Sequence, residues 1–164
     1  MKEAILHIGS NKGDRYKHLI TTRELIEIHI NPILKESKIY ETDAWGVNEQ
    51  PAFLNQVLVI NTFLKPLQLL KRLQKIEAII GKEKDFHWGP RNIDIDIIFY
   101  GSDIIKEENL TIPHPLMQER NFVLYPLNEV CRDKIHPILN CTVGEILKKC
   151  QDTLAVKNLE KIEQ

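Results

Sequence analysis

The spacing of apolar and polar residues predicts an alternation of strands and helices along most of this chain. Short apolar or alternating runs predict strands at residues 3–8, 34–41 and 52–61 and in the segment around residues 94–98. Apolar stripes at helical spacing predict helices at residues 14–29 and 66–81. The order strand, helix, strand, strand, helix, strand is typical of an α+β fold with a ferredoxin-like, mainly antiparallel sheet.

The last third of the chain has a weaker pattern, so its elements are predicted from local signals. Residues 101–103 (GSD) indicate a turn that leads back through two isoleucines, and residues 106–121 are expected to be irregular. Helical turns are predicted at residues 122–130, and a capping box at residues 142–145 opens a final helix. No repeat, low-complexity segment or linker interrupts the sequence, so we expect one domain over residues 1–164.

The segment WGPRNIDIDI, residues 88–97, is the most informative part of the sequence. Successive strand side chains point to opposite faces, so Asp94 and Asp96 share one face and the three isoleucines share the other. Ile98 is expected to continue the acidic face, with Phe99 on the opposite one. A covered acidic face needs a cation or donors, and Cα atoms roughly 6.6 Å apart suit one Mg²⁺ or two adjacent ones. The alternative is a half-buried strand whose acids lie in water.

Composition and charge limit the class of protein. A hydrophobic content of 43% and a charged content of 27% are those of a soluble globular protein. The net charge of −1 gives no whole-surface attraction to nucleic acid or to an anionic membrane. No apolar run approaches the ~20 residues of a membrane span, and the start MKEAILHIG has no signal-peptide core. We therefore expect a cytoplasmic protein without nucleic-acid or membrane partners.

The three cysteines, Cys131, Cys141 and Cys150, are an odd number without a CxxC pair. His136 lies midway between the first two, which allows a metal-binding alternative, but these spacings do not match the closely paired ligands of ordinary zinc sites. Reduced, mostly buried thiols are the better interpretation.

Five motifs, in order, resemble the 6-hydroxymethyl-7,8-dihydropterin pyrophosphokinase family. They are IGSN at 8–11, YET at 40–42, QPAFLN at 50–55, WGPRxIDIDI at 88–97, and IPHP at 112–115 leading to RNF at 120–122. The resemblance covers roughly residues 4–130, and five motifs with family-like spacing are far more specific than one. It implies the same ferredoxin-like architecture with extra strands and a C-terminal helical extension. It also implies transfer of pyrophosphate from ATP to a pterin alcohol in folate biosynthesis.

For the phosphate chemistry, the resemblance implies Asp94 and Asp96 as ligands of Mg²⁺, with two ions expected, and Arg91, His114 and Arg120 as catalytic residues. No P-loop motif is present, and ATP carries about four negative charges, so the site needs these cations. The implied ATP-binding residues are Gln74, Glu77, Lys82, Lys84, Trp88, Arg91, Ile97, Thr111, His114 and Arg120. The alternative for Gln74 and Glu77 is a place beside the core, and for Lys82 and Lys84 a solvated loop.

For the second substrate, a flat heteroaromatic ring requires aromatic faces and fixed hydrogen-bond groups at its edge. Phe53 and Phe122 match the family's stacking pair, and Asn55 shares the strand face of Phe53 and both donates and accepts. The resemblance also implies backbone contacts around Thr42, Ala44 and Trp45. Each phenylalanine alone is more often a core residue.

The sequence departs from the family pattern at several cationic positions. Lys82, Lys84 and His87 stand where arginines are expected, and so does Asn109. A lysine still neutralises phosphate but lacks the bidentate geometry of arginine. These replacements concern the affinity for ATP and leave the expected reaction type unchanged.

Two other functions fit parts of this pattern. A nucleotidyltransferase also combines Gly-Ser with Asp-x-Asp, but its Gly-Ser normally precedes the acids by about a dozen residues, and Gly9-Ser10 lies much further from Asp94. A non-catalytic pterin- or nucleotide-binding module would bind the same ligands without turnover. We expect instead a monomeric enzyme whose partners are ATP and the dihydropterin.

Overall fold

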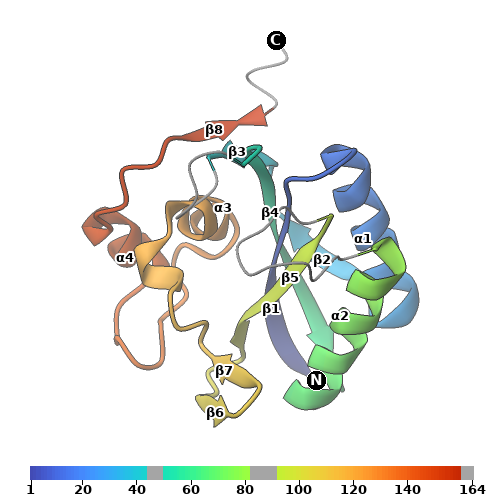
Figure 1. Ribbon diagram of the computed structural model, residues 1–164. Coiled ribbons are helices and arrows are strands. Elements are labelled where there is room, and N and C mark those ends of the chain that lie inside the picture. Colours follow the sequence, from blue (N-terminus) through green and yellow to red (C-terminus); the bar gives the residue numbers. More distant parts are fainter. Residues whose placement is uncertain (44–49, 82–91, 160–164) are drawn as a thin grey trace.

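The computed structural model describes residues 1–43, 50–81 and 92–159 (Figure 1). Its helices are α1 (Arg15–His29), α2 (Pro66–Ile80), a short 3₁₀ turn η1 (Met117–Glu119), α3 (Asn121–Cys131) and α4 (Val143–Lys149). Its strands are β1 (Lys2–Ser10), β2 (Ile33–Glu36), β3 (Tyr40–Thr42), β4 (Phe53–Thr62), β5 (Asp94–Tyr100), β6 (Ile105–Glu107), β7 (Leu110–Ile112) and β8 (Val156–Asn158).

A six-stranded sheet organises these elements. The strand order is β5-β1-β4-β3-β8, with β2 also paired to β4, and each of these pairings is antiparallel. β1 is central, with β4 on one side and β5 on the other. The predicted α+β class and antiparallel ferredoxin-like core are confirmed.

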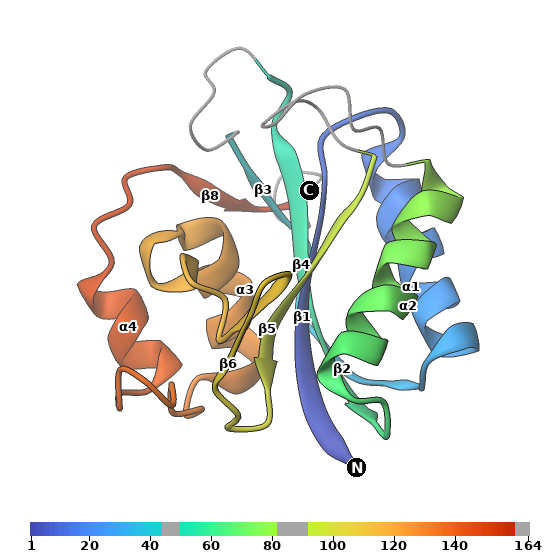
Figure 2. The ribbon, with the colours of Figure 1, turned by 60° about the horizontal axis from the view of Figure 1, so that its bottom comes forward.

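Helices cover both faces of the sheet. α1 and α2 lie on one face, and α3 and α4 lie on the other (Figures 1 and 2). Leu6 and Ile8 of β1 belong to the apolar cluster under α1 and α2, whereas Ile5 belongs to the cluster under α3 and α4. Fully burying one such side chain contributes roughly 1.5–3 kcal/mol. The strand alternation therefore decides which face each functional side chain occupies.

A β-bulge changes the alternation at the end of β5. The register of β1 with β5 shifts between Ile5, opposite Phe99, and Leu6, opposite Ile97. Ile98 is therefore the extra residue, and both Ile98 and Phe99 pack in the cluster under α3 and α4. The prediction that Phe99 occupies the opposite face is wrong, because strict alternation does not survive a bulge.

Three other predicted elements differ from the structure. The single strand predicted at 34–41 is two strands, β2 and β3, because Ser37 interrupts the regular pairing with β4. The Ser37 N–H donates to Val57 O, and the Ser37 hydroxyl accepts from Val57 N. The irregular stretch at 106–121 contains the β6–β7 hairpin and η1. The C-terminal extension is not only helical, since β8 adds a strand to β3. The capping box is confirmed, with Thr142 Oγ1 accepting from Glu145 N at 3.1 Å.

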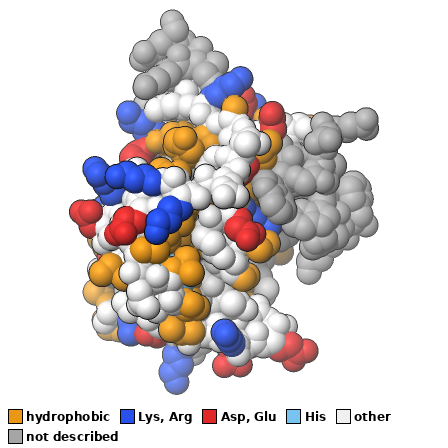
Figure 3. Space-filling model, turned by 90° about the vertical axis from the view of Figure 1, so that its left-hand side faces the viewer, with side chains coloured by type: hydrophobic (Ala, Val, Ile, Leu, Met, Phe, Trp, Pro, Cys, Tyr) orange, Lys and Arg blue, Asp and Glu red, His pale blue; other side chains and the backbone are white. Residues whose placement is uncertain are grey.

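The surface over α4 mixes charges of both signs with hydrophobic side chains (Figure 3). Within the described ranges, none of the helices is long and apolar enough to cross a membrane.

Candidate active site

The carboxylate pair lies on β5, an outer strand of the sheet. Asp94 is paired with Gly9 and Asp96 with His7 on β1, so both carboxylates lie on the face covered by α3 and α4. Both are half-buried. The isoleucines at 93, 95 and 97 pack in the cluster on the opposite face, as the alternation predicts.

These two carboxylates suit a hard divalent cation, because Mg²⁺ prefers carboxylate oxygens and keeps several of its waters. In the part of the chain that the structure describes, no group of three or more His, Cys, Asp or Glu residues could hold a metal. The pair is thus suited to a cation whose other ligands are water and substrate phosphates, rather than to a closed protein cage. The zinc alternative for Cys131, His136 and Cys141 finds no support, and the three cysteines are free thiols.

The missing side chain of Gly9 leaves a small gap, here called the hollow, among three side chains on the face that carries the carboxylates. Gly9 is paired with Asn55 on β4 and with Asp94 on β5, so the three residues form one row across neighbouring strands. A Cβ on Gly9 would lie 3.4 Å from His7 Cε1 and 3.5 Å from both Asn55 Oδ1 and Phe53 Cδ1. Three side chains therefore converge above a backbone that carries no side chain of its own.

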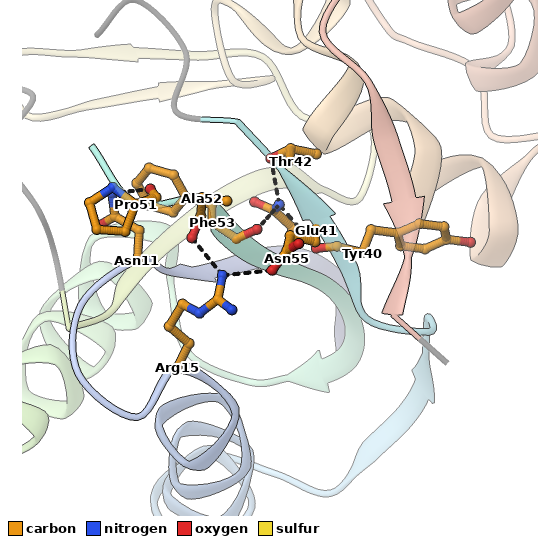
Figure 4. Close-up of polar contacts among 9 residues, drawn as sticks. All are labelled: Asn11, Arg15, Tyr40, Glu41, Thr42, Pro51, Ala52, Phe53 and Asn55. Carbon is orange, nitrogen blue, oxygen red and sulfur yellow. Dashed lines mark hydrogen bonds and ion pairs between the residues drawn. The ribbon is translucent and has the colours of Figure 1, made fainter. Parts of the chain in front are cut away.

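Asn55 is held from one side and presents an acceptor on the other. Its Nδ2 donates to Thr42 Oγ1 at 2.9 Å and to Tyr40 O at 3.3 Å, which fixes the amide against β3 (Figure 4). The side chain is fully buried, yet its Oδ1 has no protein partner among the described residues. A buried amide oxygen without a donor is a strong place for a ligand N–H.

Phe122 and Arg120 lie above the same face at the start of α3. The Phe122 ring meets the His7 ring edge to face, with centroids 5.6 Å apart. Arg120 Cζ lies 5.6 Å from the centre of the Phe122 ring. Phe122 is half-buried against the cluster under α3 and α4. An aromatic face and a cation therefore adjoin at this point of the site.

A cavity of about 300 Å³ opens at the outer edge of β5. Asp96 and Ile97 both line it, and because they point to opposite faces of the strand, the cavity lies at the strand's edge. The other walls come from α2 and from the segment around β7, including Leu70, Thr111 and His114. Three predicted ATP-binding residues, Ile97, Thr111 and His114, are thus brought together with the predicted metal ligand Asp96. Asn109, which stands at an expected arginine position, lines the same cavity.

His114 is fixed by backbone contacts on both sides. Its N–H donates to Ile98 O at 3.0 Å, and its Nδ1 accepts from Leu116 N at 3.3 Å. Burial, and then the positive charge of Arg120, lower its pKa to about 4. At neutral pH the ring is therefore neutral, and with Nδ1 used as an acceptor the proton is on Nε2. His114 can donate one hydrogen bond to an anionic oxygen without adding a full charge.

His7 and Arg120 complete the electrostatics of this face. The pKa of His7 is lowered to about 3, first by burial and then by His114 and Arg120, while the Asn55 side chain and the Phe122 backbone oppose the shift. Burial lowers the pKa of Arg120 from its ordinary value, and the carboxylates of Asp96 and Glu119 oppose this. The positive charge of Arg120 is thus coupled to the carboxylate of Asp96.

The lowered pKa values of these histidines predict a pH-dependent stability of the ligand-free protein. The unfolded chain binds protons at both rings near pH 6.5, whereas folded His7 and His114 bind them only near pH 3 and 4. Folding is then most favourable above about pH 6.5 and weakens as the pH falls, because the unfolded state takes up protons first. Denaturant titrations at about pH 7.5 and about pH 5 should show this loss, and His7→Gln should reduce it. An equal loss in wild type and variant would contradict the assignment to His7.

Comparison with known proteins decides the family. A family model described as 7,8-dihydro-6-hydroxymethylpterin-pyrophosphokinase (HPPK) matches residues 5–132. The chain belongs to this family. It is 42% identical over 154 residues to the 2-amino-4-hydroxy-6-hydroxymethyldihydropteridine pyrophosphokinase of Aquifex aeolicus, with 94% of each chain covered. The Bacillus subtilis protein of the same name is 42% identical over 130 residues, covering 79% of this chain and 78% of the relative.

Solved structures agree on the pyrophosphokinase fold. Wild-type Plasmodium falciparum HPPK-DHPS with pteroate gives a TM-score of 0.75 at 19% identity over 90% of this chain. An HPPK-DHPS complex with substrates gives 0.72 at 18% identity. This chain spans 42% and 43% of those two longer chains, and at such identity the likeness shows the fold alone. The predicted family is confirmed, and with it an enzyme of folate biosynthesis that transfers pyrophosphate to a hydroxymethyldihydropterin.

Several predicted site residues of this pyrophosphokinase lie outside the described ranges. They are Ala44, Trp45, Lys82, Lys84, Trp88 and Arg91. His87, which stands where an arginine is expected, lies outside the described ranges as well. Their roles remain predictions from the sequence.

Gln74 and Glu77 of α2 lie apart from the carboxylate face. Gln74 is exposed, and Glu77 is buried with its Oε2 accepting from Ile95 N at 3.0 Å. Ile95 also lines the cavity at the edge of β5. Glu77 therefore fixes α2 to the cavity wall, a contact that the spacing of residues along one helix could not predict.

Asn11 and Arg15 form a clamp that the sequence did not indicate. Asn11 Nδ2 donates to Gln50 Oε1 and Pro51 O, both at 3.1 Å. Arg15 Nη1 donates to Ala52 O at 2.8 Å and pairs with Glu41 Oε2 at 2.9 Å (Figure 4). The start of α1 thus holds the backbone just before Phe53. From the sequence, Asn11 is only part of the IGSN motif and has no predicted role in the site.

Arg15→Ala should weaken pterin binding through the position of Phe53. It removes a charge-assisted contact to the Ala52 carbonyl, worth roughly 1–2 kcal/mol. The KM for the pterin should rise about 5- to 20-fold, with the KM for ATP nearly unchanged. Arg23→Ala is the matched control, since Arg23 lies on the same helix and pairs with Glu36 at 3.2 Å, away from Phe53. Equal effects of the two substitutions on the pterin KM would contradict the clamp.

Proposed function

We propose that the hydroxymethyl oxygen of 6-hydroxymethyl-7,8-dihydropterin attacks the β-phosphorus of ATP in this site, giving AMP and the pterin diphosphate. The observation that supports it is the row Asn55, Gly9, Asp94 across three neighbouring strands. One end of this row offers a hollow with an aromatic ring and an amide oxygen, and the other end offers the carboxylate pair. A flat ring in the hollow would have its substituent directed along the sheet toward the phosphates.

Asp94 and Asp96 would hold Mg²⁺, with two ions proposed. Bound there, Mg²⁺ would neutralise phosphate charge and lower the pKa of the attacking hydroxyl. The fit rests on the oxygen donors, on the half-buried position of both side chains, and on the place of Asp96 at the wall of the cavity. No described side chain other than these stands out as a general base.

The cavity at the edge of β5 is the proposed site for ATP. Ile97 would contact the base, and Thr111 and His114 would contact the phosphates. The Arg120 guanidinium supplies a positive charge that is electrostatically coupled to the Asp96 carboxylate. Because phosphoryl-type transfer depends mainly on position and charge, these residues would act by orienting the triphosphate and stabilising its developing charge. Arg91, Gln74, Glu77, Lys82, Lys84 and Trp88 complete the proposed set.

The hollow above Gly9 is the proposed site for the pterin. Phe53 and Phe122 would stack on its two faces, and Asn55 Oδ1 would accept a hydrogen bond from its edge. Thr42 supports this role, since its hydroxyl holds the Asn55 amide in one orientation. Ala44 and Trp45 belong to the proposal on the strength of the motif alone.

We further propose that residues 1–164 act as a single, monomeric domain in the cytoplasm. One sheet whose two faces are both covered by apolar clusters supports a single folding unit. Size-exclusion chromatography with light scattering would test the monomer, and cell fractionation the location.

The test of the reaction is incubation with ATP, Mg²⁺ and the hydroxymethyl dihydropterin, with products separated by chromatography. AMP and pterin diphosphate are the expected products. Release of pyrophosphate instead would indicate nucleotidyl transfer, and ligand binding without AMP would indicate a binding module. Either result would overturn the proposed chemistry.

A further inference from the structure

His7 is a buried histidine whose ring lies inside the site. It occupies the middle of β1, opposite Val57 on β4 and Asp96 on β5. Its exposed fraction is 3%, and neither ring nitrogen makes a hydrogen bond of good geometry among the residues that the structure describes. The Asn55 side chain and the Phe122 backbone lie close enough to the ring to act on its pKa. Neither the motifs of the sequence nor the reaction proposed above assigns it a role.

The surroundings of this ring are those of the proposed pterin site. His7 Cε1 and the contacting atoms of Phe53 and Asn55 converge on the same point above Gly9, at 3.4–3.5 Å. The edge-to-face contact with Phe122, at 5.6 Å between centroids, joins the ring to the second proposed stacking residue. His7 is therefore enclosed by the three side chains that the reaction assigns to the pterin.

Packing alone does not account for a histidine here. A buried polar group without a hydrogen bond costs roughly 1–3 kcal/mol, a cost that a phenylalanine or leucine at the same place would avoid. Among the described residues the other buried histidine is His136, and it shows the usual solution, since its Nδ1 accepts from Ile138 N and Leu139 N, both at 3.1 Å. His7 lacks such contacts, so a ligand is the natural source of its partner.

The electrostatics of the ring select the kind of ligand. Burial, with smaller effects of His114 and Arg120, lowers the pKa of His7 to about 3, so at neutral pH the ring offers one donor and one acceptor rather than a charge for phosphate. Asn55 Oδ1, a second buried acceptor without a protein partner, lies against the same hollow. A heteroaromatic ring whose edge carries both N–H donors and ring-nitrogen or carbonyl acceptors matches this pair.

We propose that His7 is a pterin-recognition residue, whose imidazole hydrogen-bonds to the edge of the bound dihydropterin beside Asn55. This rests on the proposed function, in that the hollow above Gly9 is taken as the pterin site. With this role, His7 on β1 would contribute a pterin contact from the strand that lies between β4, which carries Phe53 and Asn55, and β5, which carries the carboxylate pair.

The test measures AMP formation by His7→Phe and His7→Gln, with each substrate varied in turn. His7→Phe keeps an aromatic ring of similar shape and removes the hydrogen bonds, so the KM for the pterin should rise roughly 5- to 100-fold while the KM for ATP changes little. His7→Gln keeps a donor and an acceptor and should recover part of the loss. A folded, active His7→Phe enzyme with an unchanged pterin KM, or with both KM values raised equally, would overturn the proposal.

His136→Gln and His136→Phe are the matched controls. His136 is as buried as His7 and also meets an aromatic ring, Phe99, at 5.8 Å. Its substitution should lower the melting temperature without selective loss of the pterin. If the same selective loss appeared in the His136 variants, the effect would be one of general packing, and the proposal would fail.

A direct readout does not depend on turnover. With ¹⁵N-labelled histidine, the ring-nitrogen signals that are absent from His7→Gln identify His7. Addition of the dihydropterin together with Mg²⁺ and a non-hydrolysable ATP analogue should shift these signals, and unmoved signals would overturn the proposal. Failure of wild-type enzyme to form AMP would refute the proposed function instead, so the two failures are distinguishable.

Discussion

Replacing Asp96 with alanine should lower kcat by roughly 10³-fold or more, because it removes charge neutralisation that is needed most in the transition state. Asp94→Ala should have a loss of the same order. Both side chains are half-buried on an outer strand rather than in the apolar core. The fold should therefore survive, and the melting temperature should change little. Steady-state AMP formation with Mg²⁺ in excess, together with a melting curve, measures both effects.

Asp103→Ala is the control for the carboxylate pair. Asp103 follows the same strand but pairs with Lys2 at 3.1 Å on an exposed surface. Removing an exposed ion pair of this kind has little effect on stability and should leave turnover near that of wild type. Near wild-type turnover in either Asp94→Ala or Asp96→Ala would show that the acidic face is only solvated.

Phe122→Ala should weaken pterin binding by roughly 1–3 kcal/mol, a magnitude taken from the stacking of bases on aromatic side chains. Phe122 contacts His7 and Arg120 rather than the cavity at the edge of β5. Binding of MgATP measured without pterin should therefore barely change. Because the ring is also packed against the cluster under α3 and α4, some loss of melting temperature is expected as well. Calorimetric titration of each ligand separates the two contributions.

Val123→Ala is the control for this second prediction. Val123 is the next residue of α3 and is buried in the same cluster, with 2% of its surface exposed. Its truncation should cost stability without selective loss of the pterin. If Phe122→Ala weakened both ligands equally, the division of the site into a pterin hollow and an ATP cavity would be wrong.

The face of each strand residue could be predicted from the sequence, because it depends only on alternation. Asp94 and Asp96 lie on one face and the three isoleucines on the other, and Phe53 and Asn55 share a face with Val57. Phe99 is the exception, since a bulge is set by the fit between two strands rather than by one of them. Local spacing therefore predicted the carboxylate pair and the Phe53–Asn55 pair but not the end of β5.

Contacts between distant segments could not be predicted in this way. His7 was read as part of an apolar first strand, and only the pairing of β1 with both β4 and β5 places it beside Asn55 and Asp96. The clamp from Arg15 to Ala52 joins residues 37 positions apart. The resemblance to the family predicted which residues share a site, whereas the strand register explains how they come together.

The contact between Glu77 and Ile95 also bears on how the outer edge of the sheet is protected. β5 is an outer strand, and the unpaired N–H and C=O groups of an outer strand can recruit a strand from another chain. The Glu77 side chain is buried, and its Oε2 accepts the Ile95 N–H on that side of the strand. Glu77, which the sequence predicts as an ATP-binding residue, would thus also protect the sheet against edge-to-edge association, and its loss would leave this N–H open to a strand from another chain.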